Sequence, residues 1–357
     1  MNSRTRSLHE QGVSLWLDNI TRKILNDGTL EKYIDELSVT GLTSNPTIFN
    51  NAITNSNDYD QAIQESGKDM NSEDLFFKLA VEDIQRAADL FSPVYERTNG
   101  VDGFVSIEVS PLLAYDTEST INAAKKIFQQ VNRPNTFIKI PGTPEGLPAI
   151  EYAIAEGIPV NVTLLFSAGQ YEAAANAWLN GIETRVKRGL NPDVRSVASL
   201  FVSRWDKAVS GKVSEALSNK LGLAVSQKAY ESYRDFLLSG RVQRLLNLGV
   251  SPQRLLWAST GTKDPALSDV LYIENLIVPF TVNTMPEKTL LAFADHGSVT
   301  KILPAKCKST EEILKQFEKE GVDIDALAQN LQTEGAESFV DSWNYLIKSI
   351  ERKIEPI

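Results

Sequence analysis

Eight short apolar runs, separated by longer amphipathic stretches, are the feature that most limits what this sequence can fold into. The runs lie at residues 14–20, 39–45, 103–110, 136–140, 159–166, 197–203, 254–259 and 279–285. Between them, stretches such as 74–91, 118–131 and 167–188 carry apolar residues three or four positions apart, which predicts helices. Eight strand–helix repeats fit a (β/α)8 TIM barrel of the α/β class better than an open doubly wound sheet. Neither a GxGxxG nor a GxxxxGK(S/T) phosphate loop occurs in the sequence.

The sequence predicts one barrel domain over residues 1–357, because no Pro/Ser-rich linker, charge block or low-complexity segment divides it. The polar residues 1–12 are expected to form a flexible tail. Two helical stretches, 206–247 and 309–352, exceed the minimal repeat, and we expect both to pack on the barrel wall as additional outer helices.

Charge and rare residues exclude several classes of function. The net charge of −10, without a basic stripe, argues against a nucleic-acid partner, although a few cations in one cleft would still allow a small phosphorylated substrate. Two histidines, His9 and His296, and one cysteine, Cys307, leave little material for a catalytic triad, a metal site or a disulfide. Neither a signal-peptide pattern nor an uncharged apolar stretch long enough to span a bilayer is found, so we expect a cytoplasmic protein without a membrane partner.

Polar side chains near the ends of the predicted strands are the candidates for chemistry, because a barrel gathers its active site at the carboxyl ends of its strands. In GFVSIEVS, Glu108 falls on the inward face, although a lone glutamate at a rim is commonly salt-bridged or solvated. In TFIKI, Lys139 points inward between two outward isoleucines. Burying an ammonium group is costly, so this lysine is either one half of a structural ion pair or an amine held neutral to attack a carbonyl.

Four further polar residues accompany this pair. Asp18 closes SLWLD, Asn45 closes VTGLTSN, and Asn161 and Thr163 share one face of the fifth predicted strand. Each could instead be a helix cap or a satisfied core group. Together, an amine, two carboxylates, amides and a hydroxyl suit a Schiff-base aldol reaction on a polyhydroxy ketone.

Two long motifs resemble the transaldolase family. VTGLTSNPTIFNNAI (39–53) is similar to the strand-two signature of that family, and FIKIPGTPEGLPAIEYAIAEGIPVNVTLLFS (137–167) to its active-lysine segment and the next strand. The similarity extends over all eight predicted strands. It implies a class I (β/α)8 enzyme of the non-oxidative pentose phosphate pathway, which needs no cofactor. Such an enzyme transfers a dihydroxyacetone unit from sedoheptulose 7-phosphate or fructose 6-phosphate to glyceraldehyde 3-phosphate or erythrose 4-phosphate.

The resemblance also implies roles for the polar residues. Lys139 matches the Schiff-base lysine, and Asp18 matches the carboxylate that takes the C4 hydroxyl proton during cleavage. Glu108 matches the residue that moves protons through a water, and Thr163 the hydroxyl that holds this water.

The resemblance also implies which residues bind the substrate. Asn45, Asn161 and Ser199 match groups that bind the hydroxyls of the three-carbon fragment. Keeping this fragment in place is what distinguishes transfer from simple aldol cleavage.

The phosphate contacts follow the family pattern only in part. Arg204 matches the phosphate-binding arginine, although it could instead pair with Asp206 or a helix acid. Ser259 matches a phosphate-contacting serine, but Gly261 stands where many relatives carry an arginine, and Lys263 is a candidate replacement. A turn and helix cap without a ligand is the alternative for this segment.

Two other functions stay open at this point. The first is a fructose-6-phosphate aldolase that releases dihydroxyacetone, although such relatives are considerably shorter. The second is a barrel that binds sugar phosphates without turning them over. The sequence does not distinguish a monomer from a homodimer.

Overall fold

Eight parallel strands form a closed barrel in chain order, and each predicted apolar run overlaps one of them. The computed structural model describes residues 1–67 and 69–354. The strands are β1 (Val13–Asp18), β2 (Val39–Thr43), β3 (Val105–Glu108), β4 (Thr136–Pro141), β5 (Val160–Leu165), β6 (Ser196–Phe201), β7 (Arg254–Ala258) and β8 (Thr281–Met285). The (β/α)8 TIM barrel is therefore confirmed.

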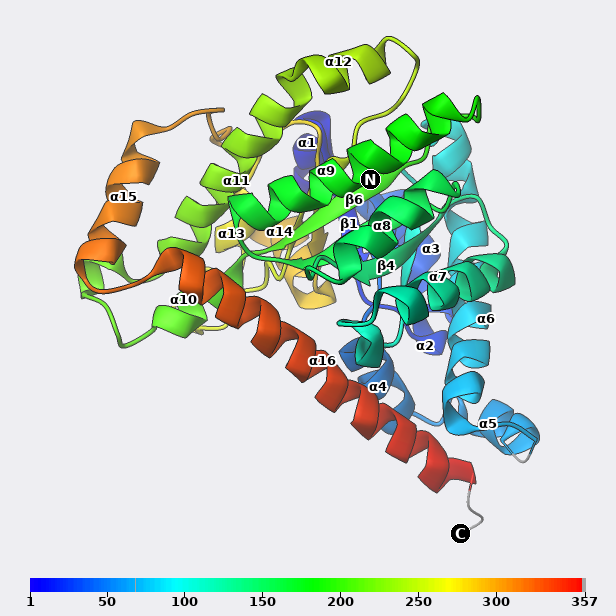
Figure 1. Cartoon of the computed structure of the whole chain (residues 1–357). Helices are drawn as coiled ribbons and strands as arrows, with labels where there is room; N and C mark the ends of the chain where they lie inside the picture. The colour runs from blue at the N-terminus through cyan, green and yellow to red at the C-terminus, as the bar shows by residue number, and fades with distance from the viewer. Residues whose placement is uncertain (68, 355–357) are drawn as a thin grey trace.

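Helices surround the barrel, and most of them connect one strand to the next (Figure 1). They are α1 (Ser3–Glu10), α2 (Arg22–Asn26), α3 (Thr29–Leu37), α4 (Pro46–Thr54), α5 (Asp60–Ser66), α6 (Ser72–Arg97), α7 (Thr117–Val131), α8 (Gly146–Ala155), α9 (Ala168–Lys187), α10 (Ser203–Val209), α11 (Leu221–Leu238), α12 (Gly240–Leu246), α13 (Leu271–Asn275), α14 (Glu287–His296), α15 (Lys308–Lys319) and α16 (Ile324–Ile354). Two short 3-10 turns are η1 (Pro111–Leu113) and η2 (Glu215–Leu217). No helix of residues 1–67 and 69–354 combines the length and apolar character that crossing a membrane requires.

Large aromatic side chains fill the inside of the barrel. Phe104 and Phe137 stack with ring centroids 4.1 Å apart, and Trp16 lies 6.0 Å from Phe137. Gly41 in β2 makes room for this layer, because a Cβ there would lie 2.5 Å from the indole of Trp16. The indole Nε1 donates to Asp102 Oδ1 at 2.7 Å, so the buried donor is satisfied. Each buried aromatic ring contributes roughly 1.5–3 kcal/mol, and together they form a rigid floor beneath the strand ends.

The first residues of the chain differ from the expected flexible tail. Residues 3–10 form α1, which packs against α14 and β1. Thr5 and Leu8 are fully buried, and the Asn2 side chain caps the helix by accepting from the amides of Arg4 and Thr5. The prediction of a flexible tail was wrong because the segment is mostly polar and only these two residues face inward.

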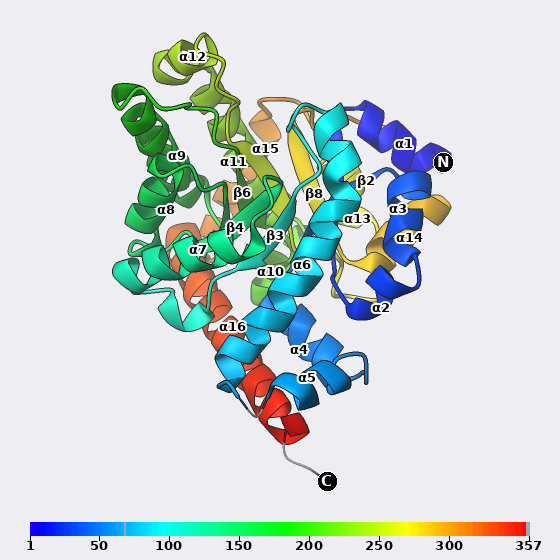
Figure 2. The ribbon, with the colours of Figure 1, turned by 90° about the vertical axis from the view of Figure 1, so that its right-hand side faces the viewer.

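The second additional helical stretch differs from expectation only in part: α15 packs against α11 on the outside, whereas α16 does not lie on the barrel wall. Figures 1 and 2 show it crossing one end of the barrel toward α4 and α5. It also contacts β5 and η1, and its side chains line the cavity at the carboxyl ends of the strands. The first stretch, 206–247, contains α11 and α12, and α11 packs against α9 and α15 on the outside as expected.

Candidate active site

A cavity of about 950 Å³ opens at the carboxyl ends of the strands. Eight of the ten predicted site residues line it: Asp18, Asn45, Lys139, Thr163, Ser199, Arg204, Ser259 and Lys263. The other two, Glu108 and Asn161, lie directly behind this lining and contact Lys139 and Ser199 respectively. The structure therefore brings the predicted residues together in one place.

Lys139 is held near the end of β4 by its neighbours on both sides. Strand register places it beside Glu108 of β3 and Asn161 of β5. Its side chain is only 6% exposed, and its Nζ lies 3.2 Å from Glu108 Oε2. The same Nζ donates to the carbonyl oxygen of Ser44 at 3.2 Å. Lys139 thus has a counter-ion, but it also faces a cavity large enough for a substrate.

Glu108 and Thr163 carry polar atoms that the protein leaves unsatisfied. Glu108 Oε1 and Thr163 Oγ1 are buried and have no hydrogen-bond partner among the described residues. Burial raises the pKa of Glu108, and the positive charge of Lys139 opposes that rise. Buried polar atoms without a protein partner are usually satisfied by water or a ligand. Glu108, which contacts Lys139, and Thr163, which lines the cavity, can therefore each bind a water.

Asp18 lies at the end of β1 with its carboxylate in the cavity. Thr43 Oγ1 donates to Asp18 Oδ1 at 2.7 Å, and the Thr284 hydroxyl lies 2.6 Å from that of Thr43. Burial raises the pKa of Asp18, whereas Lys139 and the bond from Thr43 lower it. A carboxyl group with a raised pKa and a fixed orientation suits proton transfer near neutral pH. The sequence analysis did not identify either threonine.

The amide residues have protein partners as well as cavity positions. Asn45 lines the cavity and also caps α4, because its Oδ1 accepts from the Ile48 amide at 3.1 Å. Asn161 is fully buried; its Nδ2 donates to Ser106 Oγ at 3.1 Å and its Oδ1 accepts from Ser199 Oγ at 2.7 Å. In this structure Asn161 therefore orients Ser199, which itself reaches the cavity.

Basic side chains line another part of the same cavity. Asp206 does not pair with Arg204: it accepts instead from Tyr272 Oη at 2.8 Å and from the Gly222 amide at 3.1 Å. Burial lowers the pKa of Arg204, which forms no salt bridge within the described part of the chain. Lys263 is exposed at the rim, and partial burial of its amine, followed by the charge of Arg204, lowers its pKa. This region can receive an anion.

Ser259 occupies a tight turn in this basic region. Its backbone lies in the left-handed region at φ 55°, and its hydroxyl lies 2.9 Å from that of Ser203. A Cβ at Gly261 would lie 3.2 Å from Pro286 Cγ and 3.4 Å from the Thr289 hydroxyl, so a larger side chain would be crowded there.

The sequence analysis did not identify several cavity residues, and the largest group of them comes from α16. Lys207 and Lys212, which follow Arg204 closely in the sequence, add two exposed amines. Phe339 of α16 places its ring 5.8 Å from Lys139 Nζ and 5.9 Å from Arg204 Cζ, both measured to the ring centroid. The two lysines could have been found from the sequence, because they follow Arg204 closely. Nothing in the sequence around Phe339 indicates that it reaches the cavity.

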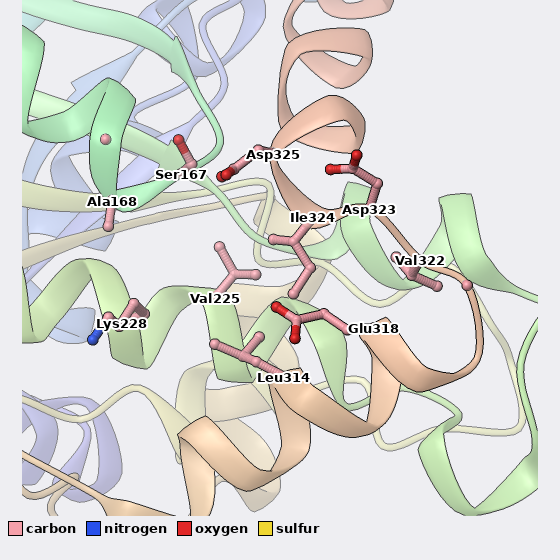
Figure 3. A pocket seen from close by; sticks show the side chains of 12 residues that line it. Ser167, Ala168, Val225, Lys228, Leu314, Glu318, Val322, Asp323, Ile324 and Asp325 are labelled. Carbon is pink, nitrogen blue, oxygen red and sulfur yellow. The ribbon is translucent and has the colours of Figure 1, made fainter.

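A second pocket of about 610 Å³ lies between α9, α11, α15 and the start of α16. Figure 3 shows Val225, Leu314 and Ile324 close together, with acidic side chains such as Glu318 and Asp323 around them. None of the predicted site residues lines this pocket. Residues 1–67 and 69–354 contain no group of three His, Cys, Asp or Glu side chains arranged to hold a metal ion.

Known proteins of one family are similar to this chain over nearly its full length. A family model described as Transaldolase/Fructose-6-phosphate aldolase matches residues 15–350. A protein named Transaldolase from Kocuria rhizophila is 42% identical over 99% of both chains. Another from Arthrobacter sp. is 43% identical over 98% of this chain and 97% of its own. A third from Trichodesmium erythraeum is 40% identical over 97% of this chain and 96% of its own.

The similarity therefore extends over nearly the whole chain and includes every strand that contributes to the cavity. The chain belongs to the transaldolase/fructose-6-phosphate aldolase family.

Proposed function

We propose that this protein is a transaldolase that transfers a dihydroxyacetone unit between ketose and aldose phosphates through a Schiff base on Lys139. The donors would be sedoheptulose 7-phosphate and fructose 6-phosphate, and the acceptors glyceraldehyde 3-phosphate and erythrose 4-phosphate. The observation that carries the proposal is the buried Lys139 amine, 3.2 Å from Glu108 Oε2 and open to a cavity that Asp18 also lines. The transaldolase names of the full-length relatives support the same reaction.

In the first step, the Lys139 ammonium gives one proton to Glu108, 3.2 Å away, and the resulting amine attacks the C2 carbonyl carbon of the ketose. The carbinolamine then loses its oxygen as water, which leaves an iminium on Lys139. Glu108 supplies the proton for this loss through a water that also contacts Thr163. The unsatisfied oxygen atoms Glu108 Oε1 and Thr163 Oγ1 support this role. No metal or organic cofactor takes part, since the iminium itself accepts the electrons of the next step.

In the second step, Asp18 takes the proton of the C4 hydroxyl and the C3–C4 bond breaks. The bond's electron pair moves into the iminium and forms an enamine, while C4 becomes the aldehyde of the departing aldose phosphate. Thr43 holds the carboxylate of Asp18 in orientation by donating to Oδ1 at 2.7 Å. The raised pKa of Asp18 suits this role, because the same carboxyl returns the proton when the acceptor aldehyde is attacked.

Transfer requires the three-carbon enamine to stay bound until an acceptor arrives. Asn45 and Ser199 line the cavity and can bind its hydroxyls, with Asn161 fixing Ser199 from behind. The phosphate of the donor or acceptor would bind the basic side of the cavity at Arg204, Ser259 and Lys263. Binding at both ends places the reacting carbons close to Lys139.

We further propose that the protein acts in the cytoplasm on small sugar phosphates, as a monomer or homodimer, without a nucleic-acid or membrane partner. The net charge of −10 supports a small substrate held by local cations rather than an extended phosphate backbone.

Borohydride trapping tests the proposal directly. Incubation with fructose 6-phosphate and borohydride should leave a reduced three-carbon adduct on the peptide that contains Lys139, and Lys139→Met should abolish it. Lys263→Met, which removes a different cavity lysine, should still form the adduct. An adduct on another lysine, or none at all, would refute the mechanism. Free dihydroxyacetone formed equally fast with and without acceptor would instead indicate the aldolase activity.

A further inference from the structure

We propose that Phe339 of α16 is a specificity-determining residue that shields the Lys139-bound fragment from water and so favours transfer over release. This inference rests on the proposed function. Phe339 is 5% exposed, and its ring centroid lies 5.8 Å from Lys139 Nζ and 5.9 Å from Arg204 Cζ. A donor bound at both cations must therefore run past this ring, with its central carbons beside the apolar face.

The position of the ring is fixed by the way α16 docks on the strand ends. Gln332 Nε2 donates to the carbonyl oxygens of Gly142 and Leu164, at 3.0 and 2.9 Å. Gly335 brings the helix backbone close to the barrel, because a Cβ there would lie 2.9 Å from Leu164 Cδ2 and 3.2 Å from Arg204 Nη1. Gln332, Gly335 and Phe339 are spaced three and four residues apart, so they lie on one face of the helix.

The rest of α16 holds that face in place. Trp343, one turn beyond Phe339, packs edge-on against Phe76 of α6 with ring centroids 5.0 Å apart. The Ser342 hydroxyl lies 2.8 Å from that of Thr47 in α4. Contacts therefore hold α16 in place both before and after Phe339 in the sequence, so the ring has a fixed position over the cavity.

The chemistry explains why such a cover matters. After cleavage, the enamine either attacks an acceptor aldehyde or is lost by hydrolysis. Loss requires a proton on the nucleophilic enamine carbon, then addition of water to C2 and departure of the Lys139 amine, so that one water is consumed and dihydroxyacetone is released. An apolar ring beside these carbons limits the supply of water and protons, whereas an acceptor that binds through its phosphate still reaches the carbon.

The test measures the ratio of free dihydroxyacetone to transferred product, with fructose 6-phosphate as donor and erythrose 4-phosphate as acceptor. Phe339→Ala should raise this ratio by at least about tenfold, since the ring no longer excludes water, and Phe339→Leu should raise it less. In deuterium oxide, the released dihydroxyacetone should carry one deuterium on the former enamine carbon. Borohydride trapping on Lys139 should persist in both variants.

Phe317→Ala is the matched control, because Phe317 is a fully buried phenylalanine of α15 that does not line the cavity. It should lower the melting temperature without changing the ratio. A folded Phe339→Ala variant with the wild-type ratio would overturn the inference, and if that variant does not fold, Phe339→Leu decides by the same criterion. Absence of adduct or transfer in the wild-type protein would instead refute the proposed function.

Discussion

Replacing Glu108 with glutamine separates a catalytic role from a structural one, because the change keeps the shape of the side chain and removes its charge. Glu108 Oε2 lies 3.2 Å from Lys139 Nζ, and both side chains are almost fully buried, 4% and 6% exposed. If Glu108 serves mainly as a counter-ion, its loss should destabilise the fold. If it moves protons during Schiff-base formation, its loss should slow the reaction.

The structure favours a large effect on rate and a smaller one on stability. Removing one partner of a buried ion pair typically costs about 3–5 kcal/mol when the remaining charge has no other partner. Here burial raises the pKa of Glu108, so the charged carboxylate is itself disfavoured, and removing the charge relieves part of that cost. The amine also keeps the Ser44 carbonyl as an acceptor. Loss of the acid–base group should slow turnover by about 10²-fold or more.

The assay compares turnover and the rate of borohydride trapping with unfolding in urea for the same preparations. Asp83→Asn is the matched control: Asp83 is fully buried, accepts from Arg22 Nε at 3.0 Å, and does not line the cavity. It should lower the stability, because Arg22 Nε and Tyr59 Oη lose a charged acceptor, while its folded fraction keeps wild-type turnover. A Glu108→Gln variant that loses as much stability as Asp83→Asn, with unchanged turnover and trapping rates, would refute the catalytic role.

Two further predictions concern Asp18 at the end of β1 and Lys263 in the basic part of the cavity. Burial raises the pKa of Asp18 above its ordinary 3.8, so this group stabilises the fold at low pH and that contribution is lost as the pH rises through the folded-state value. Asp18→Asn should therefore gain stability relative to wild type as the pH rises above 3.8 in urea titrations, and a difference that stays constant with pH would contradict the assignment. Lys263→Met should raise KM for fructose 6-phosphate by about tenfold with little change in kcat, the signature of lost ground-state binding. Lys301→Met, which changes an exposed lysine outside the cavity, should not, and equal kinetics for the two variants would exclude Lys263 from the phosphate site.

The strands and the central lysine could be predicted because their signals are local. A period of two along a short strand fixes which side chains point inward, and it placed Glu108 and Lys139 inside before their partners were known. In the barrel these two residues are register neighbours on adjacent strands. Parallel strands in chain order bring their ends together, so a polar residue near each end was enough to locate the cavity.

The cover of the cavity could not be predicted, because the relevant contacts join residues far apart in the sequence. The amphipathic pattern of 309–352 predicted helices, but the barrel wall, on which we expected them to pack, is not the surface that α16 covers. Gln332 and Leu164 are separated by 168 positions, and their hydrogen bond is what directs α16 across the strand ends. The same limit explains Asn161, whose inward direction was clear but whose bonds to Ser106 and Ser199 were not.

The glycine-rich turn after Lys139 links α16, which covers the cavity, to the strand that carries the lysine. A Cβ at Gly142 would displace the Leu165 side chain, whose Cδ2 would lie 2.4 Å away, whereas one at Gly146 would lie 2.0 Å from the Pro141 carbonyl oxygen, so only glycine fits at position 146. The turn follows the end of β4 and presents the Gly142 carbonyl to Gln332. The segment that ends the lysine's strand thus also anchors the helix above it. Because the aromatic floor lies beneath and α16 lies above, the amine is held on both sides by packed structure, which is the condition for a preorganised nucleophile.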